Sequence, residues 1–117
     1  MAELSIIIPA RNEMFLENTI KDLLTNIEGD TEIIVILDGY LPNPRIVTGD
    51  SRVKFLYNQE SVGQRAAMNQ GVKVSTAKYV MKVDAHCAFD KGFDKKMIKE
   101  MKDNYTMVPV MRNLWVF

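Results

Sequence analysis

Runs of consecutive apolar residues alternate along the chain with segments whose apolar residues recur every three or four positions. Continuous apolar runs predict buried strands, and helical spacing predicts amphipathic helices. Strands are predicted at 4–9, 32–37, 53–57, 79–83 and 106–111, and helices at about 13–28, 61–74 and 93–104. This alternation indicates an α/β fold, with a mostly parallel sheet that carries helices on both faces.

Polar residues and glycines mark the ends of the predicted helices. Asn12 can cap the first helix, and Gly29 follows its last apolar position. Ser61 and Gln64 have the spacing of a capping box at the start of the second helix. Gly71 lies inside that helix, where glycine has a low helix propensity, so we expect a weak point there.

Length and composition narrow the class of protein. The 117 residues suggest one domain, 1–117, and the 47% apolar content is enough for a core. A net charge of zero argues against a broad nucleic-acid-binding surface. The single cysteine excludes an internal disulfide and fits a reducing compartment such as the cytoplasm. No apolar stretch approaches the length of a membrane span.

Polar clusters follow three of the predicted strands. They occupy positions 10–13, 38–39 and 84–86, and Arg65 lies near the start of the second helix. Because the carboxyl ends of parallel strands meet at one edge, ligands bind there, at the switch in strand order. Carboxylates, an imidazole, an arginine and a helix N-terminus together suit a divalent cation with a diphosphate.

Asp84 and His86 are the candidate metal ligands, since they are two residues apart just past a predicted strand. A carboxylate with an imidazole suits Mn²⁺, Zn²⁺ or iron better than Mg²⁺. Taken alone, the pair is explained as well by a turn at the strand end, and Cys87 by packing. Lys82, inside an apolar strand, requires a sheet edge, a partner or a mobile neighbour.

Other nucleotide-binding and hydrolytic motifs are missing from the sequence. No Gly-x-Gly-x-x-Gly follows the first strand, and no Walker-type Gly-Lys-Ser/Thr is present. The Gly-x-Ser-x-Gly turn of serine hydrolases is also absent.

Three quoted segments carry a resemblance to a known family. They are LSIIIPARNE, EIIVILDG and NQESVGQRAAMNQGVKVSTAKYVMKVDAHC. Together they resemble the Rossmann-like, nucleotide-sugar-binding half of glycosyltransferases with the GT-A fold, of the family-2 type. The ending DAHC is most similar to polypeptide N-acetylgalactosaminyltransferases, whose metal motif is Asp-x-His. The resemblance covers nearly the whole chain.

The resemblance implies roles for individual residues. Asp38 would contact the uracil or ribose, and Asp84 and His86 would bind the metal, with Asp84 also near the ribose. The metal would neutralise the diphosphate leaving group. The nucleotide-binding positions that it implies are Pro9, Ala10, Arg11, Glu13, Asp38, Gly63, Arg65 and Asp84.

The sequence departs from the family pattern in two ways. Leu37 stands where the family commonly has the first of two adjacent acids. The acceptor-binding half, which supplies the catalytic base in inverting members, is not in the chain, so no catalytic base can be named. Because the chain ends on the apolar residues 114–117, we expect a domain truncated before that half, with self-association through the exposed end.

These expectations combine into one main hypothesis and two alternatives. The main one is a metal-dependent glycosyltransferase that transfers a hexosyl or acetylhexosaminyl group from a UDP-sugar to an unknown acceptor. Its metal would be Mn²⁺, with Mg²⁺ or another divalent cation as alternatives. The second hypothesis is a non-catalytic nucleotide-binding or assembly module with the same fold. The third is a nucleotidyltransferase, which the lack of glycine in residues 10–13 disfavours.

Overall fold

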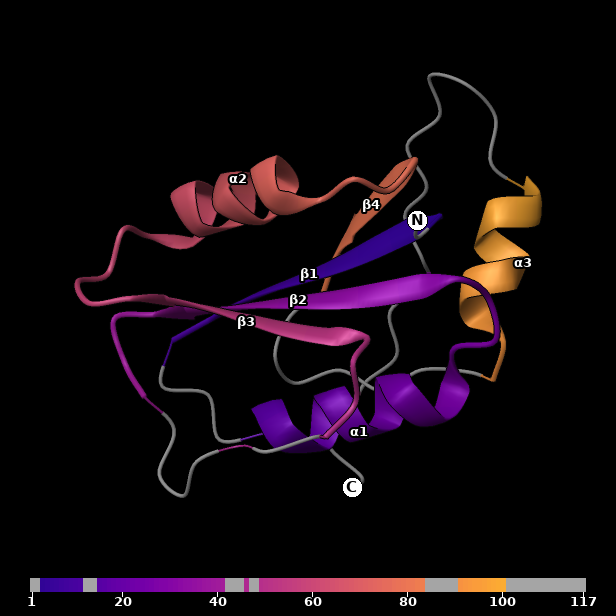
Figure 1. Ribbon diagram of the computed structural model, residues 1–117, viewed down its shortest axis with the longest axis horizontal. Coiled ribbons are helices and arrows are strands. Elements are labelled where there is room, and N and C mark those ends of the chain that lie inside the picture. The colour runs from indigo at the N-terminus through magenta and orange to yellow at the C-terminus, as the bar shows by residue number, and fades with distance from the viewer. Residues whose placement is uncertain (1–2, 12–14, 42–45, 47–48, 84–90, 101–117) are drawn as a thin grey trace.

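The computed structural model describes residues 3–11, 15–41, 46, 49–83 and 91–100 (Figure 1). Four strands and three helices lie within these residues. Their order is β1 (Leu4–Ala10), α1 (Leu16–Asn26), β2 (Thr31–Asp38), β3 (Val53–Asn58), α2 (Gln64–Val74), β4 (Tyr79–Lys82) and α3 (Phe93–Glu100). The strand predicted at 106–111 lies outside the described residues.

The four strands form one parallel sheet in the order β3-β2-β1-β4. Ile7 of β1 aligns with Ile34 of β2 on one side and with Lys82 of β4 on the other. The chain moves outward from β1 to β3 and then returns through α2 to the opposite side of β1. The switch in strand order therefore lies between β1 and β4, where open α/β sheets bind ligands.

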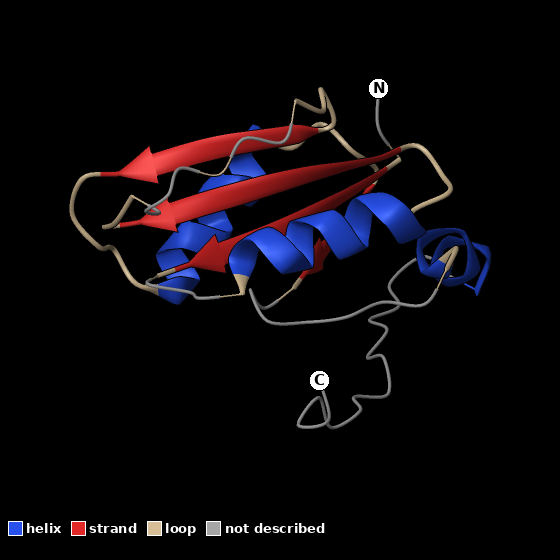
Figure 2. Cartoon of the chain, turned by 90° about the horizontal axis from the view of Figure 1, so that it is seen from below, coloured by secondary structure: helices blue, strands red, loops and turns tan. Residues whose placement is uncertain are grey.

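Helices cover both faces of the sheet, so the predicted fold class is confirmed (Figures 1 and 2). Successive residues of a strand point to opposite faces. Ile6 and Ile8 of β1 belong to the core cluster that includes α1 and Phe93 of α3. Ile7 packs in a second, smaller cluster with Ala67 of α2. All of β1 is buried, which explains why Ser5, whose hydroxyl is hydrogen-bonded to Glu32 and Ser75, is its one polar residue.

Lys82 lies on β4, an edge strand of the described sheet, and its side chain is exposed. The sequence left three explanations for this lysine, namely a sheet edge, a partner or a mobile neighbour. The structure supports the sheet edge. An edge strand tolerates a charged side chain because one side of it does not pack against a further strand. Lys82 shares a face with Ile7, so it lies on the side of the sheet that α2 covers.

Gly71 is a close-packing position. It is buried in α2, and a Cβ atom built there would lie 2.5 Å from Cγ2 of Ile7. Helix α2 therefore approaches β1 closely because residue 71 has no side chain. The low helix propensity that marked Gly71 in the sequence is the cost of this packing.

Asp94 joins α3 to the turn between α1 and β2. Its buried carboxylate accepts hydrogen bonds from the amides of Glu28 (3.0 Å) and Gly29 (2.8 Å) and from the hydroxyl of Thr31 (2.6 Å). Burial would raise the pKa of Asp94, but these bonds, with one from the Lys95 amide, outweigh it, and the pKa is lowered.

Some predicted boundaries are wrong. Helix α1 begins at Leu16 rather than 13, and its cap position is Phe15, without a side-chain capping bond. Asn12 lies outside the described residues. Helix α2 begins at Gln64, and its cap is Gly63, so the predicted capping box at Ser61 does not form. Among the described residues, no helix has the length and hydropathy needed to cross a membrane.

Gly71→Ala tests the close approach of α2 to β1. The added methyl group must displace Ile7, which we expect to lower the free energy of unfolding by about 1–3 kcal/mol despite alanine's better helix propensity. Lys73→Ala, at an exposed position of the same helix, should change it by less than about 0.5 kcal/mol. Urea denaturation measures both, and a more stable Gly71→Ala variant would contradict this packing.

Asp94→Asn tests the connection between α3 and the α1–β2 turn. We expect a loss of about 3 kcal/mol at pH 7, because an amide replaces a charged acceptor of several hydrogen bonds. A lowered folded-state pKa gives stability that is present above the unfolded value of about 3.9 and is lost as the pH falls through the folded value. As the pH falls below 4, the free energy of unfolding of Asp94→Asn should therefore decrease less than that of the wild type. Equal acid sensitivity in urea titrations would contradict this role.

Candidate functional site

The carboxyl ends of the strands carry the residues that the sequence predicted for a site. Pro9 and Ala10 are buried at the end of β1, and Arg11 is exposed directly after it. Asp38 ends β2, where it aligns with Asn58 of β3. Glu13, Asp84 and His86 lie outside the described residues. Within those residues, no group of three or more His, Cys, Asp and Glu side chains could hold a metal ion.

Asp38 is 3% exposed and lies beneath the segment that connects β3 to α2. Its carboxylate accepts four hydrogen bonds from that segment and from β3. Oδ1 accepts from the Val62 amide (2.9 Å) and Asn58 Nδ2 (3.1 Å), and Oδ2 from Ser61 Oγ (2.9 Å) and the Gly63 amide (3.0 Å). A carboxylate offers about four acceptor sites, so these donors use the full capacity of the group.

The ionised form of Asp38 is favoured by these bonds. Burial would raise the pKa of the carboxyl, but the donors listed above outweigh it and lower the pKa. The predicted contact between Asp38 and the nucleoside stays a prediction. What the structure adds is a second role, in which the carboxylate organises the segment before α2.

Two glycines allow the β2 end and the α2 start to meet. Gly39 has a φ of +83°, and a Cβ atom there would lie 2.8 Å from the Ser61 amide nitrogen. Gly63, the cap residue of α2, has a φ of +90°. Side chains strongly disfavour such φ values, so glycine suits both positions. Asn58 and Gln70 add reciprocal amide hydrogen bonds of 2.7 and 3.0 Å between β3 and α2.

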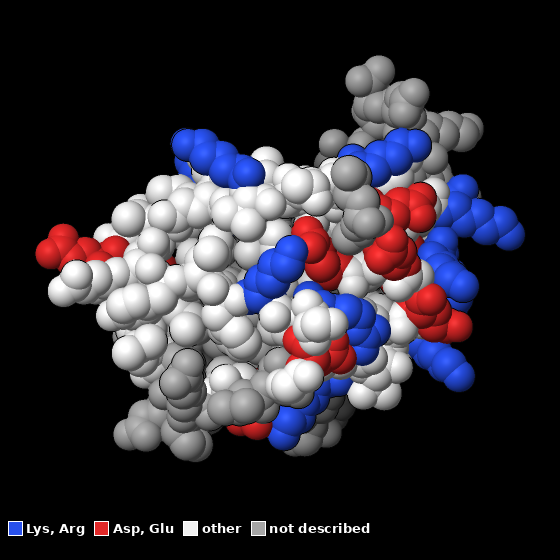
Figure 3. Space-filling view, in the orientation of Figure 1, with Lys and Arg blue, Asp and Glu red and all other residues white. Residues whose placement is uncertain are grey.

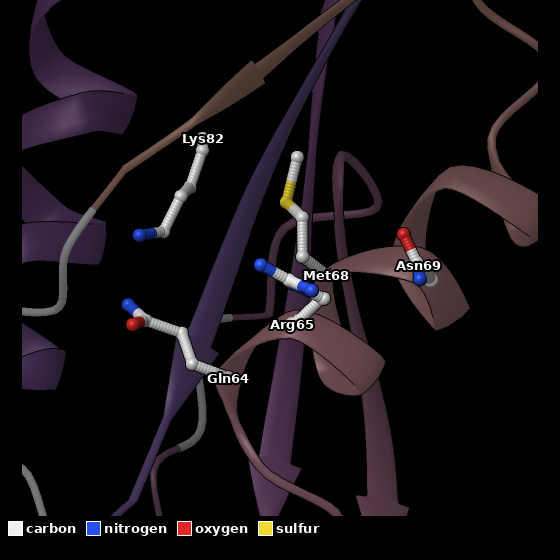
Figure 4. Close-up of a pocket in the computed structure, with 5 residues that line it drawn as sticks. All are labelled: Gln64, Arg65, Met68, Asn69 and Lys82. Carbon is white, nitrogen blue, oxygen red and sulfur yellow. The ribbon is translucent and has the colours of Figure 1, made fainter.

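A groove lies between the first half of α2 and the end of β4 (Figure 4). Its volume is about 310 Å³. It is lined by Gln64, Arg65, Met68, Asn69 and Lys82. Lys82 and Gln64 extend toward each other across it. Two cationic side chains, two amides and the apolar Met68 side chain therefore meet beside the switch in strand order.

The start of α2 lies beside this groove. The amide of its cap residue, Gly63, already donates to the ionised carboxylate of Asp38, which offsets part of the positive end of the helix, and the first turn itself contains no acidic residue. The first N–H groups of a helix carry a partial positive charge and favour anions. Gln64 and Arg65, which follow the cap directly, line the groove. The arrangement suits a ligand with negative charge.

The groove is a local feature rather than part of an extended basic surface. On the face shown in Figure 3, Lys and Arg side chains of the described residues are interspersed with Asp and Glu. This distribution agrees with the net charge of zero. A local cationic groove fits a small anionic ligand better than a polyanion such as a nucleic acid.

Sequence reasoning found Arg65 but missed the other groove residues. Lys82 carried a signal, because a charged residue inside an apolar strand needs an explanation. Gln64 was interpreted as part of a capping box, and Met68 and Asn69 gave no signal. Their meeting depends on the placement of α2 over β1 and β2, next to β4, which the sequence pattern alone does not determine.

Comparisons with known proteins agree on the family. A family model described as glycosyl transferase family 2 matches residues 5–114. An uncharacterized glycosyltransferase of Rickettsia conorii is 29% identical over an alignment of 107 residues, which covers 87% of this chain and 18% of the relative. The poly-beta-1,6-N-acetyl-D-glucosamine synthase of Staphylococcus epidermidis is 28% identical over an alignment of 102 residues, which covers 84% of this chain and 25% of the synthase.

A solved structure supports the fold. S. aureus TarS superposes with a TM-score of 0.68 at 18% sequence identity, over 93% of this chain and 23% of TarS. The chain thus spans between 18% and 25% of the length of these proteins. With a family model matching nearly all of its residues, the chain belongs to glycosyl transferase family 2.

Proposed function

We propose that this chain is the nucleotide-sugar-binding part of a metal-dependent glycosyltransferase that uses a UDP-sugar donor. The observation that carries the proposal is the groove in which Arg65 of α2 and Lys82 of β4 meet beside the switch in strand order. A diphosphate carries charge that two cations and a helix N-terminus can balance. Membership of family 2 supports a nucleotide-sugar donor as the source of that diphosphate.

In this proposal, one part of the donor binds in the groove and another part binds at the rim of the sheet. The groove would take the diphosphate. Pro9, Ala10, Arg11 and Glu13 would surround the nucleoside beyond the end of β1. Gly63 leaves space at the start of α2, since nothing lies within 4 Å of a Cβ atom built there. That space allows a ligand to approach the backbone closely.

The proposal assigns the divalent metal to Asp84 and His86. A carboxylate and an imidazole are a suitable donor set for Mn²⁺, the metal that we propose, and Mg²⁺ is a weaker candidate. A bound metal would act as a Lewis acid on the leaving diphosphate. Arg65 and Lys82 would hold the same group from the side of α2 and β4.

The relatives guide the choice of sugar. The S. epidermidis relative is named as a synthase of poly-beta-1,6-N-acetyl-D-glucosamine. That name supports acetylhexosaminyl transfer over hexosyl transfer.

Asp84→Ala and His86→Ala test the metal. We expect UDP to bind the wild-type chain in the presence of Mn²⁺ and to lose affinity strongly when EDTA is added. Either variant should lose the Mn²⁺-dependent part of the affinity, because the donor set becomes incomplete. Calorimetry measures this, with Asp30→Ala, in the exposed turn before β2, as a control that keeps wild-type affinity. Equal, metal-independent affinity in wild type and Asp84→Ala would contradict the proposal.

Arg65→Ala and Lys82→Ala test the groove. Each should weaken UDP binding about tenfold, which corresponds to about 1.4 kcal/mol and is the range of one charge-assisted hydrogen bond. Uridine, which lacks phosphate, should bind wild type and both variants equally. Lys73→Ala removes a charge from the last turn of α2, outside the groove, and should leave UDP affinity unchanged. If both groove variants bind UDP as tightly as wild type, the diphosphate does not lie there.

A further inference from the structure

We infer that Asp38 is a positioning residue, which fixes the start of α2 through residues 61–63 and so sets the geometry of the groove. The inference deepens the proposed function and rests on it for the identity of the ligand. Asp38 is the last residue of β2, and Gln64 and Arg65 of the groove follow residue 63 directly. The carboxylate thus connects the end of β2 to the helix start whose side chains would hold an anion.

The contacts of Asp38 are concentrated on this one segment. Three of its four donors belong to Ser61, Val62 and Gly63, which are consecutive and are themselves exposed to solvent. An exposed segment of three residues buries little apolar surface of its own, so its conformation depends on hydrogen bonds. Hydrogen bonds to an ionised carboxylate are stronger than hydrogen bonds between two neutral groups.

The chemistry of this site requires a carboxylate. Both oxygens of Asp38 face donors, with an amide N–H on each and one further side-chain donor on each. An asparagine at this position would turn an NH₂ group toward two of those donors. The donors would then lose their acceptor, and the segment would have to move to find water.

The backbone of the segment is also constrained by what it contacts. Gly39, next to Asp38, packs against Ser61 so closely that a Cβ atom there would be 2.8 Å from the Ser61 amide. Gly63 has a φ of +90°, a conformation that the bond from its amide to Asp38 holds in place. When this hold is lost, the segment and the first turn of α2 are no longer fixed, while packing of Gly71 against Ile7 still holds the later part of the helix on the sheet.

The competing role for Asp38 is direct contact with the nucleoside, and Ser61→Ala separates the two roles. This change removes one donor and leaves the carboxylate with a vacant acceptor site. Positioning predicts weaker UDP binding in Ser61→Ala, by about threefold to tenfold, because the segment is held less well. Direct contact predicts unchanged or tighter binding, because the carboxylate becomes more available to a ligand.

Asp38→Asn is the main test, and Asp94→Asn is its matched control. Asp94 is also a buried aspartate that accepts hydrogen bonds from backbone amides, but it belongs to α3 and holds the α1–β2 turn at the opposite, amino end of the sheet. Both variants should be less stable, so UDP titrations are made at 10 °C, where circular dichroism must show both folded. We expect Asp38→Asn to lose at least tenfold in UDP affinity and Asp94→Asn to keep the wild-type value.

Hydrogen exchange provides a readout that does not depend on the ligand. In wild type and in Asp94→Asn, the amides of Val62 and Gly63 should be protected by their bonds to Asp38. In Asp38→Asn they should exchange at least tenfold faster, together with the first turn of α2. Unchanged protection there, or UDP affinity equal to wild type in a folded Asp38→Asn, would overturn the inference. Wild-type chain that fails to bind UDP would instead refute the proposed function, and the exchange result would still decide the role of Asp38.

Discussion

Strand β1 is the constraint on which the rest of the structure depends. It is paired on both edges, with β2 and β4, and covered on both faces, by α1 and α2. A strand enclosed in this way needs apolar residues, or polar ones whose hydrogen bonds are satisfied, as Ser5 is by Glu32 and Ser75. It also needs a helix that can approach closely, which Gly71 allows. Because β4 returns to the far side of β1, the switch in strand order falls at this strand. The central strand thereby determines where a ligand site can form.

Much of the fold could be predicted from local pattern, and much of the site could not. The continuous apolar runs of β1 and β2 report burial on both faces, so the fold class followed from them. Ser61 shows why the site is harder to predict. Its spacing from Gln64 is that of a capping box, yet its hydroxyl donates to Asp38, which is distant in sequence. In a capping box the serine oxygen would accept a hydrogen bond from a backbone N–H of the helix, whereas here the hydroxyl donates to a buried carboxylate from another part of the chain.

Two buried aspartates perform the same physical task at opposite ends of the sheet. Asp38 holds the segment before α2, and Asp94 holds the turn before β2. In both, burial would raise the carboxyl pKa, but the hydrogen bonds outweigh burial and the pKa is lowered. Neither role was visible in the sequence, because an aspartate after a strand or at a helix start is ordinary. Their importance comes from donors supplied by other parts of the chain.

The cationic groove is formed by side chains from two separate elements of the fold. Arg65 and Lys82 come from different elements and meet because α2 packs over β1 and β2, which brings its first half beside the neighbouring strand β4. Under the proposed function, groups of this kind would hold a leaving group, and they would not remove a proton from an acceptor. Affinity for the donor, rather than turnover, is therefore the property that Arg65 and Lys82 would control.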